Sequence, residues 1–194
     1  MNISELFLLR YDPLYQFWLG SIWDIVSEEL MRQRPDPRVN SIAWNLWHLT
    51  RAEDFGVNRF VAERSQILIA GDWTQKLNLP WRHSGNGMSF SEVDDFNQRI
   101  DLPALRAYSD AVQASTREVI NLLPGLDLDA SLKVEHVRMV VIDEGLAHSD
   151  AEGLIQNYTG WSKGKCLMTL GLTHSYQHVG EIDVIASLLG INFD

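Results

Sequence analysis

The sequence predicts an all-α fold, a bundle of four long helices in a single domain that covers residues 1–194. Three observations support this prediction. Apolar residues recur at three- and four-residue spacing in four long stretches, which is the period of a helix with one buried face. Capping residues, proline or glycine stand at most of the expected helix ends. The length suits one domain, and 45% hydrophobic residues are enough for a sizeable core.

The first helix is predicted over residues 3–31. Asp12-Pro13 has the form of an N-cap followed by a first-turn proline, so we expect the helix to restart there after a short leading turn. The apolar face expected for this helix consists of Leu14, Phe17, Trp18, Ile22, Ile25, Val26 and Leu30.

The second helix is predicted to begin after the capping pair Asn40-Ser41 and to end near residue 63. Residues 64–101 contain several glycine, proline and asparagine residues and form a long crossover between the second and third helices. Long connections of this kind let neighbouring helices of a bundle run parallel. A short helix is expected within residues 87–96, with a serine as its cap.

The third helix is predicted over residues 102–123, after the N-cap residue Asp101. Residues 126–163 form an irregular insertion before the last helix. Within the insertion, alternating residues at 137–141 indicate a short extended segment. The capping-box pattern at Ser149–Glu152 indicates a short helix.

The last helix is predicted over residues 165–189 and carries His174 and His178, one helical turn apart. Steps of four residues lead from this pair to Leu170 and Ile182, so both imidazoles lie on the core-facing side. Buried imidazoles need partners, because an unsatisfied buried polar group costs about 1–3 kcal/mol. A shared divalent ion such as zinc or nickel satisfies both. Two core histidines with separate hydrogen bonds are the alternative.

His48 adds a third imidazole in the middle of the second helix. Its neighbours at helical spacing, Trp44 and Phe55, are apolar, so His48 also faces the interior. We therefore predict that His48, His174 and His178 bind one divalent metal ion. Structural zinc sites usually have four protein ligands, so three ligands leave a position open, as in catalytic sites.

Glu181 lies one turn beyond the histidine pair and is the candidate catalytic residue. It could orient an imidazole or act as a base through a bound water; a solvated helix carboxylate is the alternative. Glu53 and Asp54 could act in the same way, but we interpret them as solvated. The remaining histidines are interpreted as surface residues, and His83 is the best placed of them to reach the mouth of a site. They are His83, His136 and His148.

The composition excludes several classes of function. A net charge of −10 would repel a polyanion and disfavours binding to nucleic acid or to an anionic membrane. Neither a transmembrane span nor a signal peptide is predicted, so we expect a cytoplasmic protein. The one cysteine, Cys166, excludes an intramolecular disulfide and is predicted to be a small buried side chain. No H-E-x-x-H, P-loop or G-x-S-x-G pattern is present.

Two motifs together resemble a known family. WNLWHLTRAED around His48, combined with THSYQHVGEIDVIASLLG in the last helix, resembles the DinB/YfiT superfamily of metal-binding four-helix bundles. GNGMSFSEVDDF, before the third helix, is also similar to the family's loop. The resemblance implies an up-down-down-up bundle with residues 64–101 as the crossover. It also implies that His48, His174 and His178 are ligands of nickel, zinc or a similar ion.

The resemblance further implies an activity. Characterised relatives include mycothiol-dependent maleylpyruvate isomerase and bacillithiol S-transferases, in which the metal is thought to hold and activate a thiolate, and homodimers are common. A metal-dependent thiol S-transferase or isomerase acting on a small electrophile, with a low-molecular-weight thiol as cofactor, is therefore expected. A hydrolase that uses a metal-bound water and a non-catalytic protein with a structural ion remain as alternatives. The insertion at 126–163 exceeds a minimal connection and could cover the site or form a dimer contact.

Overall fold

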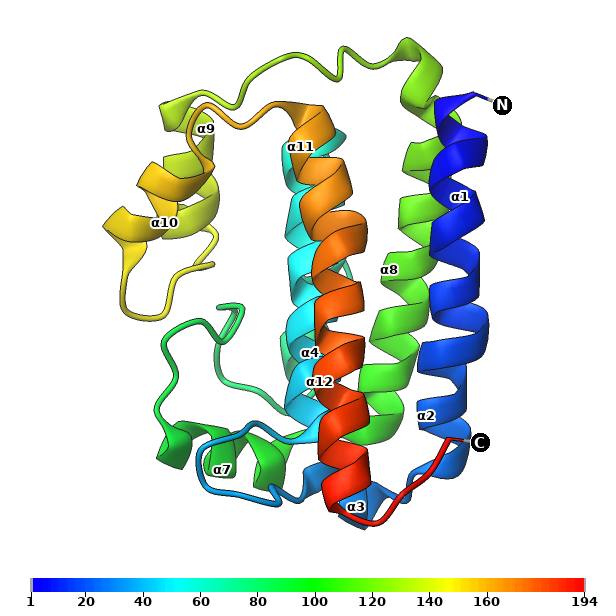
Figure 1. Cartoon of the computed structure of the whole chain (residues 1–194). Helices are drawn as coiled ribbons and strands as arrows, with labels where there is room; N and C mark the ends of the chain where they lie inside the picture. The colour runs from blue at the N-terminus through cyan, green and yellow to red at the C-terminus, as the bar shows by residue number, and fades with distance from the viewer. Residues whose placement is uncertain (1, 194) are drawn as a thin grey trace.

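The computed structural model describes residues 2–193. Within that range every regular element is a helix, and the one β-type contact is an isolated bridge between Ser131 and Ser162. Figure 1 shows the long helical segments side by side, with the crossover and the insertion on one flank. The prediction of an all-α fold is confirmed.

The first long segment consists of α1 (Ile3–Pro13), a π-helical turn (Leu14–Leu19) and α2 (Gly20–Ile25). The predicted restart at Asp12-Pro13 is wrong, because α1 continues from Ile3 through Pro13. Proline cannot donate the N–H that an α-helix requires, and the wider π-helical turn directly after it accommodates this loss. A short helix, α3 (Glu28–Arg32), follows.

Part of the apolar face predicted for this segment is exposed. Leu14, Ile22 and Val26 are buried, as expected. Phe17 and Trp18, in contrast, are 67% and 50% exposed, and Ile25 is also half-exposed. The prediction was wrong for these three because apolar residues occupy more of the helix circumference than the core can cover.

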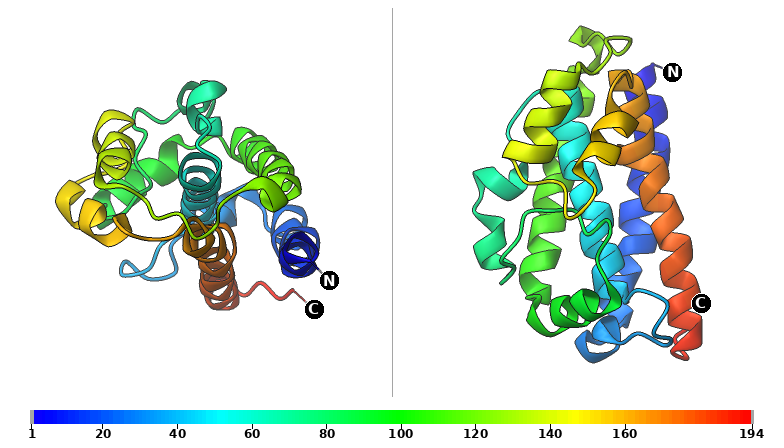
Figure 2. Two further views of the ribbon diagram at one scale, coloured as in Figure 1. Left: turned by 90° about the horizontal axis from the view of Figure 1, so that it is seen from above. Right: turned by 90° about the vertical axis from the view of Figure 1, so that its left-hand side faces the viewer.

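The second long segment is α4 (Ile42–Glu53), continued by π-helical turns (Asp54–Val61). As predicted, it begins at a capping residue, since the Ser41 hydroxyl accepts a hydrogen bond from the Trp44 backbone N–H at 3.0 Å. All twelve residues of α4 are buried. The view from above in Figure 2 shows why: α4 lies between α8, the last helix and the crossover.

The crossover contains three short helices and leads into the third long helix, which matches its prediction. The Ser89 cap and the Glu92 side chain form a capping box at the start of the last of the three. Asp101 caps the third long helix. The bounds are α5 (Ile67–Ala70), α6 (Trp73–Lys76), α7 (Phe90–Arg99) and α8 (Leu102–Leu122).

The insertion is helical where an extended segment was predicted. Val137, Val140 and Val141 are buried while Met139 and Ile142 are exposed, which is a helical rather than a two-residue period. The predicted short helix is present, with Asp150 as its cap. The bounds are a 3₁₀ turn (Leu123–Gly125), α9 (Val134–Arg138), a π-helical turn (Met139–Asp143) and α10 (Ala151–Tyr158).

The last long segment consists of α11 (Lys163–Met168), a π-helical turn (Thr169–Thr173) and α12 (His174–Leu188). Gly190 has φ +77° just beyond its end, as predicted for a helix C-terminus. In Figure 1 this segment lies directly against α4 and runs in the opposite direction. None of the helices in residues 2–193 combines the length and apolarity that a membrane-spanning segment needs.

Candidate metal centre

The structure brings the three predicted histidines together. His48 extends from α4, while His174 and His178 extend from the first turns of α12. The three ring centroids are 4.5 to 5.0 Å apart. One nitrogen of each ring lies within 4.8 Å of the other two, so the group could hold a metal ion. Within residues 2–193 this is the one group of three or more such side chains.

Two glycines bring the helices that carry the histidines close together. A Cβ atom at Gly56 would lie 2.4 Å from Leu170 Cβ, and one at Gly171 would lie 2.9 Å from Val57 Cγ2. Both distances are too short for a real side chain, so the two segments can pack this closely only with glycine at these positions. The close crossing places the start of α12 beside His48.

The crossover fixes the orientation of the His48 ring. Its Nδ1 lies 2.5 Å from the backbone carbonyl oxygen of Ser84. A carbonyl can only accept, so Nδ1 carries the hydrogen and Nε2 retains its lone pair. The Trp44 ring stacks on His48 with centroids 4.6 Å apart and the planes 14° from parallel. The His48 ring is therefore fixed by a hydrogen bond at one edge and by stacking on one face.

Two acceptors fix the His178 ring. Its Nδ1 lies 2.8 Å from Asn45 Oδ1 and 2.9 Å from Glu181 Oε2. The Asn45 side-chain amide also donates to the Ser41 carbonyl oxygen at 3.0 Å, which turns its oxygen towards the histidine. Nδ1 of His178 is therefore the protonated nitrogen, and its Nε2 is an acceptor.

His174 is the third imidazole of the group. Its Nε2 lies 3.2 Å from Nε2 of His178, and its buried Nδ1 has no hydrogen-bond partner. If Nδ1 carries the hydrogen, two lone pairs face each other; if Nε2 carries it, the lone pair of Nδ1 is buried alone. A divalent ion contacted by the Nε2 atoms resolves this conflict. Neutral imidazoles suit zinc or nickel, so these residues fit the predicted metal.

The surroundings keep all three rings neutral. Burial, together with smaller repulsions from His174 and His178, lowers the pKa of His48 to about 3. Burial also lowers the pKa of His174 to about 4. It lowers the pKa of His178 as well, against the opposing effect of the Glu181 carboxylate. At neutral pH the lone pairs are therefore available to a metal ion.

The other three histidines do not join the group. His83 was interpreted as a surface residue, but it is only 8% exposed and stacks on Trp81 with centroids 5.4 Å apart. His148 lies edge-on against His83 and has its Nε2 2.8 Å from Glu92 Oε1. His136, which lies in the insertion, packs against the ring of Phe60 in the second long segment.

Glu53 and Asp54 are not solvated, so that interpretation was wrong. Both are 0% exposed. Glu53 accepts hydrogen bonds from three hydroxyl groups, and Asp54 accepts from several donors around the start of the crossover. Cys166 is buried, as predicted, and burial raises the pKa of its thiol to about 12. The thiol is therefore no nucleophile at neutral pH.

Sequence reasoning missed two groups that orient the rings, Asn45 and the Ser84 carbonyl. Asn45 lies three residues before His48, on the same helix face, and that spacing could have revealed it. The signal at Ser84 is the following glycine. Gly85 has φ +94°, and a Cβ there would lie 2.6 Å from the Trp47 ring. Glycine thus lets the crossover pass close over α4 and reach His48.

The fold and this site define a class, the helical proteins with a candidate three-histidine metal site between two helices. Comparison with known proteins gives the family. The sequence profile of the DinB superfamily matches residues 19–182, so the chain belongs to the DinB superfamily. This confirms the resemblance noted in the sequence.

A solved structure supports the same fold. The crystal structure of a conserved protein from Enterococcus faecalis is similar, with a TM-score of 0.71 over 98% of this chain and 99% of that chain. The two are 15% identical in sequence, so this likeness concerns the fold alone. No curated protein matches the chain.

Proposed function

We propose that the chain is a metal-dependent thiol S-transferase or isomerase that acts on a small electrophile. The observation that carries the proposal is the set of three neutral imidazoles, with no fourth ligand side chain grouped with them among residues 2–193. Three nitrogen ligands leave a position open to an exogenous molecule. A nickel or zinc ion held by His48, His174 and His178 would lower the pKa of a thiol at that position and make the thiolate available.

The remaining residues have positioning roles in this proposal. The Ser84 carbonyl and Asn45 hold Nδ1–H groups, so that Nε2 of His48 and of His178 point inwards. Glu181 contacts His178 on the Nδ1 edge, away from the centre of the group, which favours an orienting role over that of a base. This contact supports thiol chemistry over the hydrolase alternative, which needs a base beside a bound water.

The thiol must come from a separate molecule. Cys166 is fully buried and its pKa is raised to about 12, so the chain itself offers no reactive thiol. A low-molecular-weight thiol is therefore the cofactor that the proposal requires. The scaffold we infer is the up-down-down-up bundle of the family, in which the crossover brings the Ser84 carbonyl oxygen to the Nδ1 edge of His48.

The first experiment measures metal content and turnover together. We expect about one nickel or zinc ion per chain in protein purified without a metal-affinity column, and its loss in His174→Ala. His136→Ala is the matched control, since His136 lies outside the group, and it should keep the ion. Glutathione, bacillithiol and mycothiol are then tested against a panel of electrophiles. Turnover with one thiol, lost in His174→Ala, supports the proposal.

Three outcomes would contradict it. An unchanged metal content in His174→Ala would exclude the ligand set. A melting temperature that falls on chelation, with no thiol bound and no electrophile consumed, would favour the alternative of a structural ion. Hydrolysis of an ester or amide without any thiol would favour the hydrolase alternative.

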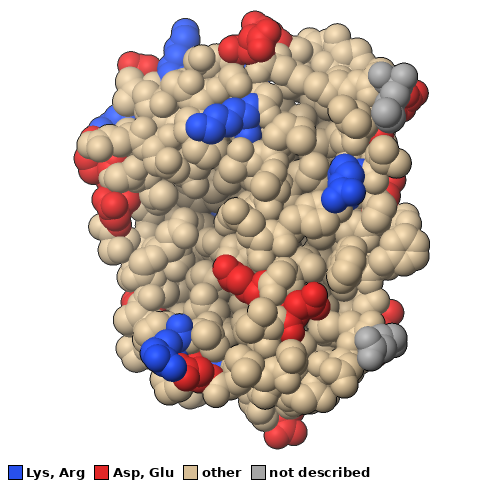
Figure 3. All heavy atoms as spheres, viewed as in Figure 1, with Lys and Arg blue, Asp and Glu red and all other residues tan. Residues whose placement is uncertain are grey.

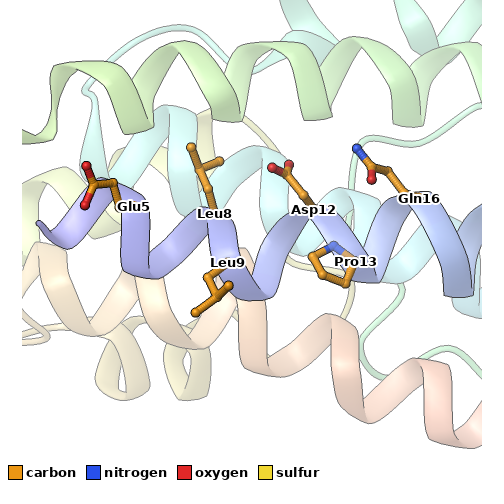
Figure 4. Close-up of a pocket in the computed structure, with 6 residues that line it drawn as sticks. All are labelled: Glu5, Leu8, Leu9, Asp12, Pro13 and Gln16. Atoms are coloured by element: carbon orange, nitrogen blue, oxygen red, sulfur yellow. The ribbon is translucent and has the colours of Figure 1, made fainter. Parts of the chain in front are cut away.

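We also propose that the protein is a homodimer that uses its N-terminal apolar patch, defined as Leu6, Leu9, Phe17, Trp18 and Ile25. Phe17 is 67% and Leu9 59% exposed, and large apolar side chains exposed along one helical segment are candidates for an interaction site. A hollow of about 640 Å³ lies along the same helix. Figure 4 shows Leu9 and Pro13 on one side of it, and Glu5, Leu8, Asp12 and Gln16 on the side towards α8.

Sedimentation velocity tests the dimer. We expect the wild type to sediment as a dimer at micromolar concentration and Phe17→Glu to sediment as a monomer. Val184→Glu, at an equally exposed apolar position of α12 outside the patch, is the control and should remain dimeric. A monomeric wild type would contradict the proposal.

A further inference from the structure

A pocket lies beside the candidate metal centre, between α12 and the segment that precedes α4. Its volume is about 550 Å³, and its walls include Val39, Asn40, Gly180, Val184 and Ile185. Sites for small molecules typically measure roughly 300–1,000 Å³ and combine apolar walls with a few polar groups. The pocket therefore has the size and the mixed lining of a ligand site.

The pocket and the metal centre share one wall. Asn45 and Glu181 both line the pocket, and both also accept a hydrogen bond from Nδ1 of His178. The imidazole thus stands between the pocket and the other two histidines. A ligand in the pocket would contact the same carboxylate that orients a metal-binding ring.

The packing of the chain does not require glycine at position 180. It lies in the interior of α12, where glycine destabilises a helix relative to alanine. A Cβ at Gly180 would meet no atom within 4 Å. At Gly56 and Gly171, in contrast, a Cβ would collide with the neighbouring helix. Glycine at position 180 therefore leaves free space along the pocket wall, where a ligand can approach the backbone.

The pocket lining contains one acidic side chain, Glu181, and one basic side chain. Its one basic side chain, Arg38, is already paired with Asp36, with Nε 2.9 Å from Oδ1 and Nη2 2.9 Å from Oδ2. Glu181 is 55% exposed, and its Oε2 contacts only a histidine N–H. Figure 3 shows acidic side chains near the centre of this face and basic ones mostly farther out. A carboxylate in this setting attracts a cationic donor.

From these observations we propose that the pocket binds a small molecule with a primary ammonium group on a short alkyl chain. The ammonium group donates to Glu181, and the side-chain amides of Asn40 and Gln177 lie within the same lining. The alkyl chain lies over Gly180 and contacts Val184 and Ile185. The proposal goes beyond the thiol chemistry, since this binding needs neither a thiol nor an electrophile.

The test uses n-butylamine as the probe, with butyrate and 1-butanol as size-matched controls. Each is titrated into isotope-labelled, metal-free protein, and the backbone amide signals are followed by NMR. We expect saturable shifts in residues 38–40 and 177–185 with butylamine alone. Glu181→Gln should weaken this binding about tenfold or more, because the charge is lost. Asp183→Asn, on the same helix outside the pocket, should leave it unchanged.

Gly180 provides a second, independent arm. Gly180→Leu should fill the pocket and abolish the butylamine shifts, while Gly180→Ala should raise the melting temperature. A lower melting temperature in Gly180→Ala would show a structural need for glycine and overturn the argument. Equal binding of butyrate, or butylamine shifts that survive unchanged in Glu181→Gln, would also overturn it. The NMR titration uses no thiol and no metal. Amine binding can therefore fail while the proposed function stands, and the proposed function can fail while amine binding stands.

Discussion

Two buried polar clusters lie on the segment that contains α4, one to two turns apart, and their hydrogen bonding differs. In the acidic cluster, Asp54 accepts from the backbone N–H groups of Ile67 and Leu68 and from the Tyr108 hydroxyl. Glu53 is likewise surrounded by hydroxyl donors. In the histidine cluster, acceptor nitrogens face one another, and Nδ1 of His174 has no partner. Burial alone does not mark a binding site; the distinguishing feature here is three neighbouring imidazoles whose acceptor nitrogens face one another without a donor between them.

The acidic cluster positions the histidine cluster. Asp54 anchors the start of the crossover through Ile67 and Leu68. Arg51, paired with Asp54, donates to the Arg82 carbonyl oxygen at 3.0 Å in the middle of the crossover. Two residues further on, the Ser84 carbonyl oxygen meets His48. The acidic cluster is thus a structural support that delivers one of the groups orienting the metal site.

The largest expected effect follows from breaking the acidic cluster. Asp54→Ala leaves the guanidinium of Arg51 buried without its carboxylate and frees the crossover. We expect a loss of about 3–5 kcal/mol in the free energy of unfolding, measured by urea denaturation. Asp110→Ala, at an exposed position of α8, is the control and should change stability by less than about 0.5 kcal/mol. A similar small effect for Asp54→Ala would contradict a structural role.

Removing the metal tests the histidine cluster in the same comparison. Ligand-linked stabilisation amounts to about 3 kcal/mol when free metal exceeds its dissociation constant a hundredfold. We expect a chelator to abolish this stabilisation in the wild type and to have no effect on His48→Ala. Metal-free His48→Ala should itself be less stable than metal-free wild type, because the buried ring stacks on Trp44 and donates to Ser84, so the measured quantity is the change that the chelator causes in each protein. Equal chelator sensitivity in both proteins would be inconsistent with the site.

The acidic cluster should also impose a pH dependence. Burial raises the pKa of Glu53 from 4.5 to about 6, against the opposing effect of its hydroxyl donors. The stability linked to this shift is fully present below pH 4.5 and is lost as the pH rises through 6. The rise in the pKa of Glu53 on folding corresponds to about 2 kcal/mol in the free energy of unfolding. We expect urea denaturation of metal-free wild type, compared with Glu53→Gln, to show this relative loss between pH 4 and 7.5; parallel curves would refute it.

The smallest expected effect concerns the orientation of His178. Glu181→Ala removes one of two acceptors at Nδ1 while Asn45 remains, so metal affinity should fall only about tenfold, at the lower end for such partners. A chelator competition assay measures this change. Asp183→Ala, exposed on the same helix, should leave the affinity unchanged. An identical decrease in both variants would indicate a general charge effect instead of a contact with His178.

Local spacing predicted the part of the site that depends on one helix. His174 and His178 lie one turn apart whatever surrounds them, and the capping residues Ser41 and Asp101 start their helices as expected. The Ser84 contact was not predictable in this way, because it depends on the path of a long crossover. That path is determined by the buried Asp54 and Arg51 contacts, which no periodic pattern contains.

The errors have a common physical cause. Periodicity assumes that each helix has one face in solvent, so Glu53 and Asp54 were assigned to a solvated face. The segment that carries them is enclosed on all sides, and both carboxylates are buried. The opposite error occurred in the first helix, where Phe17 and Trp18 were assigned to the core. Which helix is central and which is peripheral is decided by the packing of all four.

The stacking of Trp44 on His48 has an optical consequence. An indole ring 4.6 Å from a candidate ligand is close enough for a bound ion with a partly filled d shell, such as nickel, to quench its emission. Occupancy by such an ion therefore has an intrinsic fluorescent reporter within the protein. The difference in emission between the wild type and Trp44→Phe isolates this signal from that of the other six tryptophans. Metal exchange can then be followed in real time without any attached label.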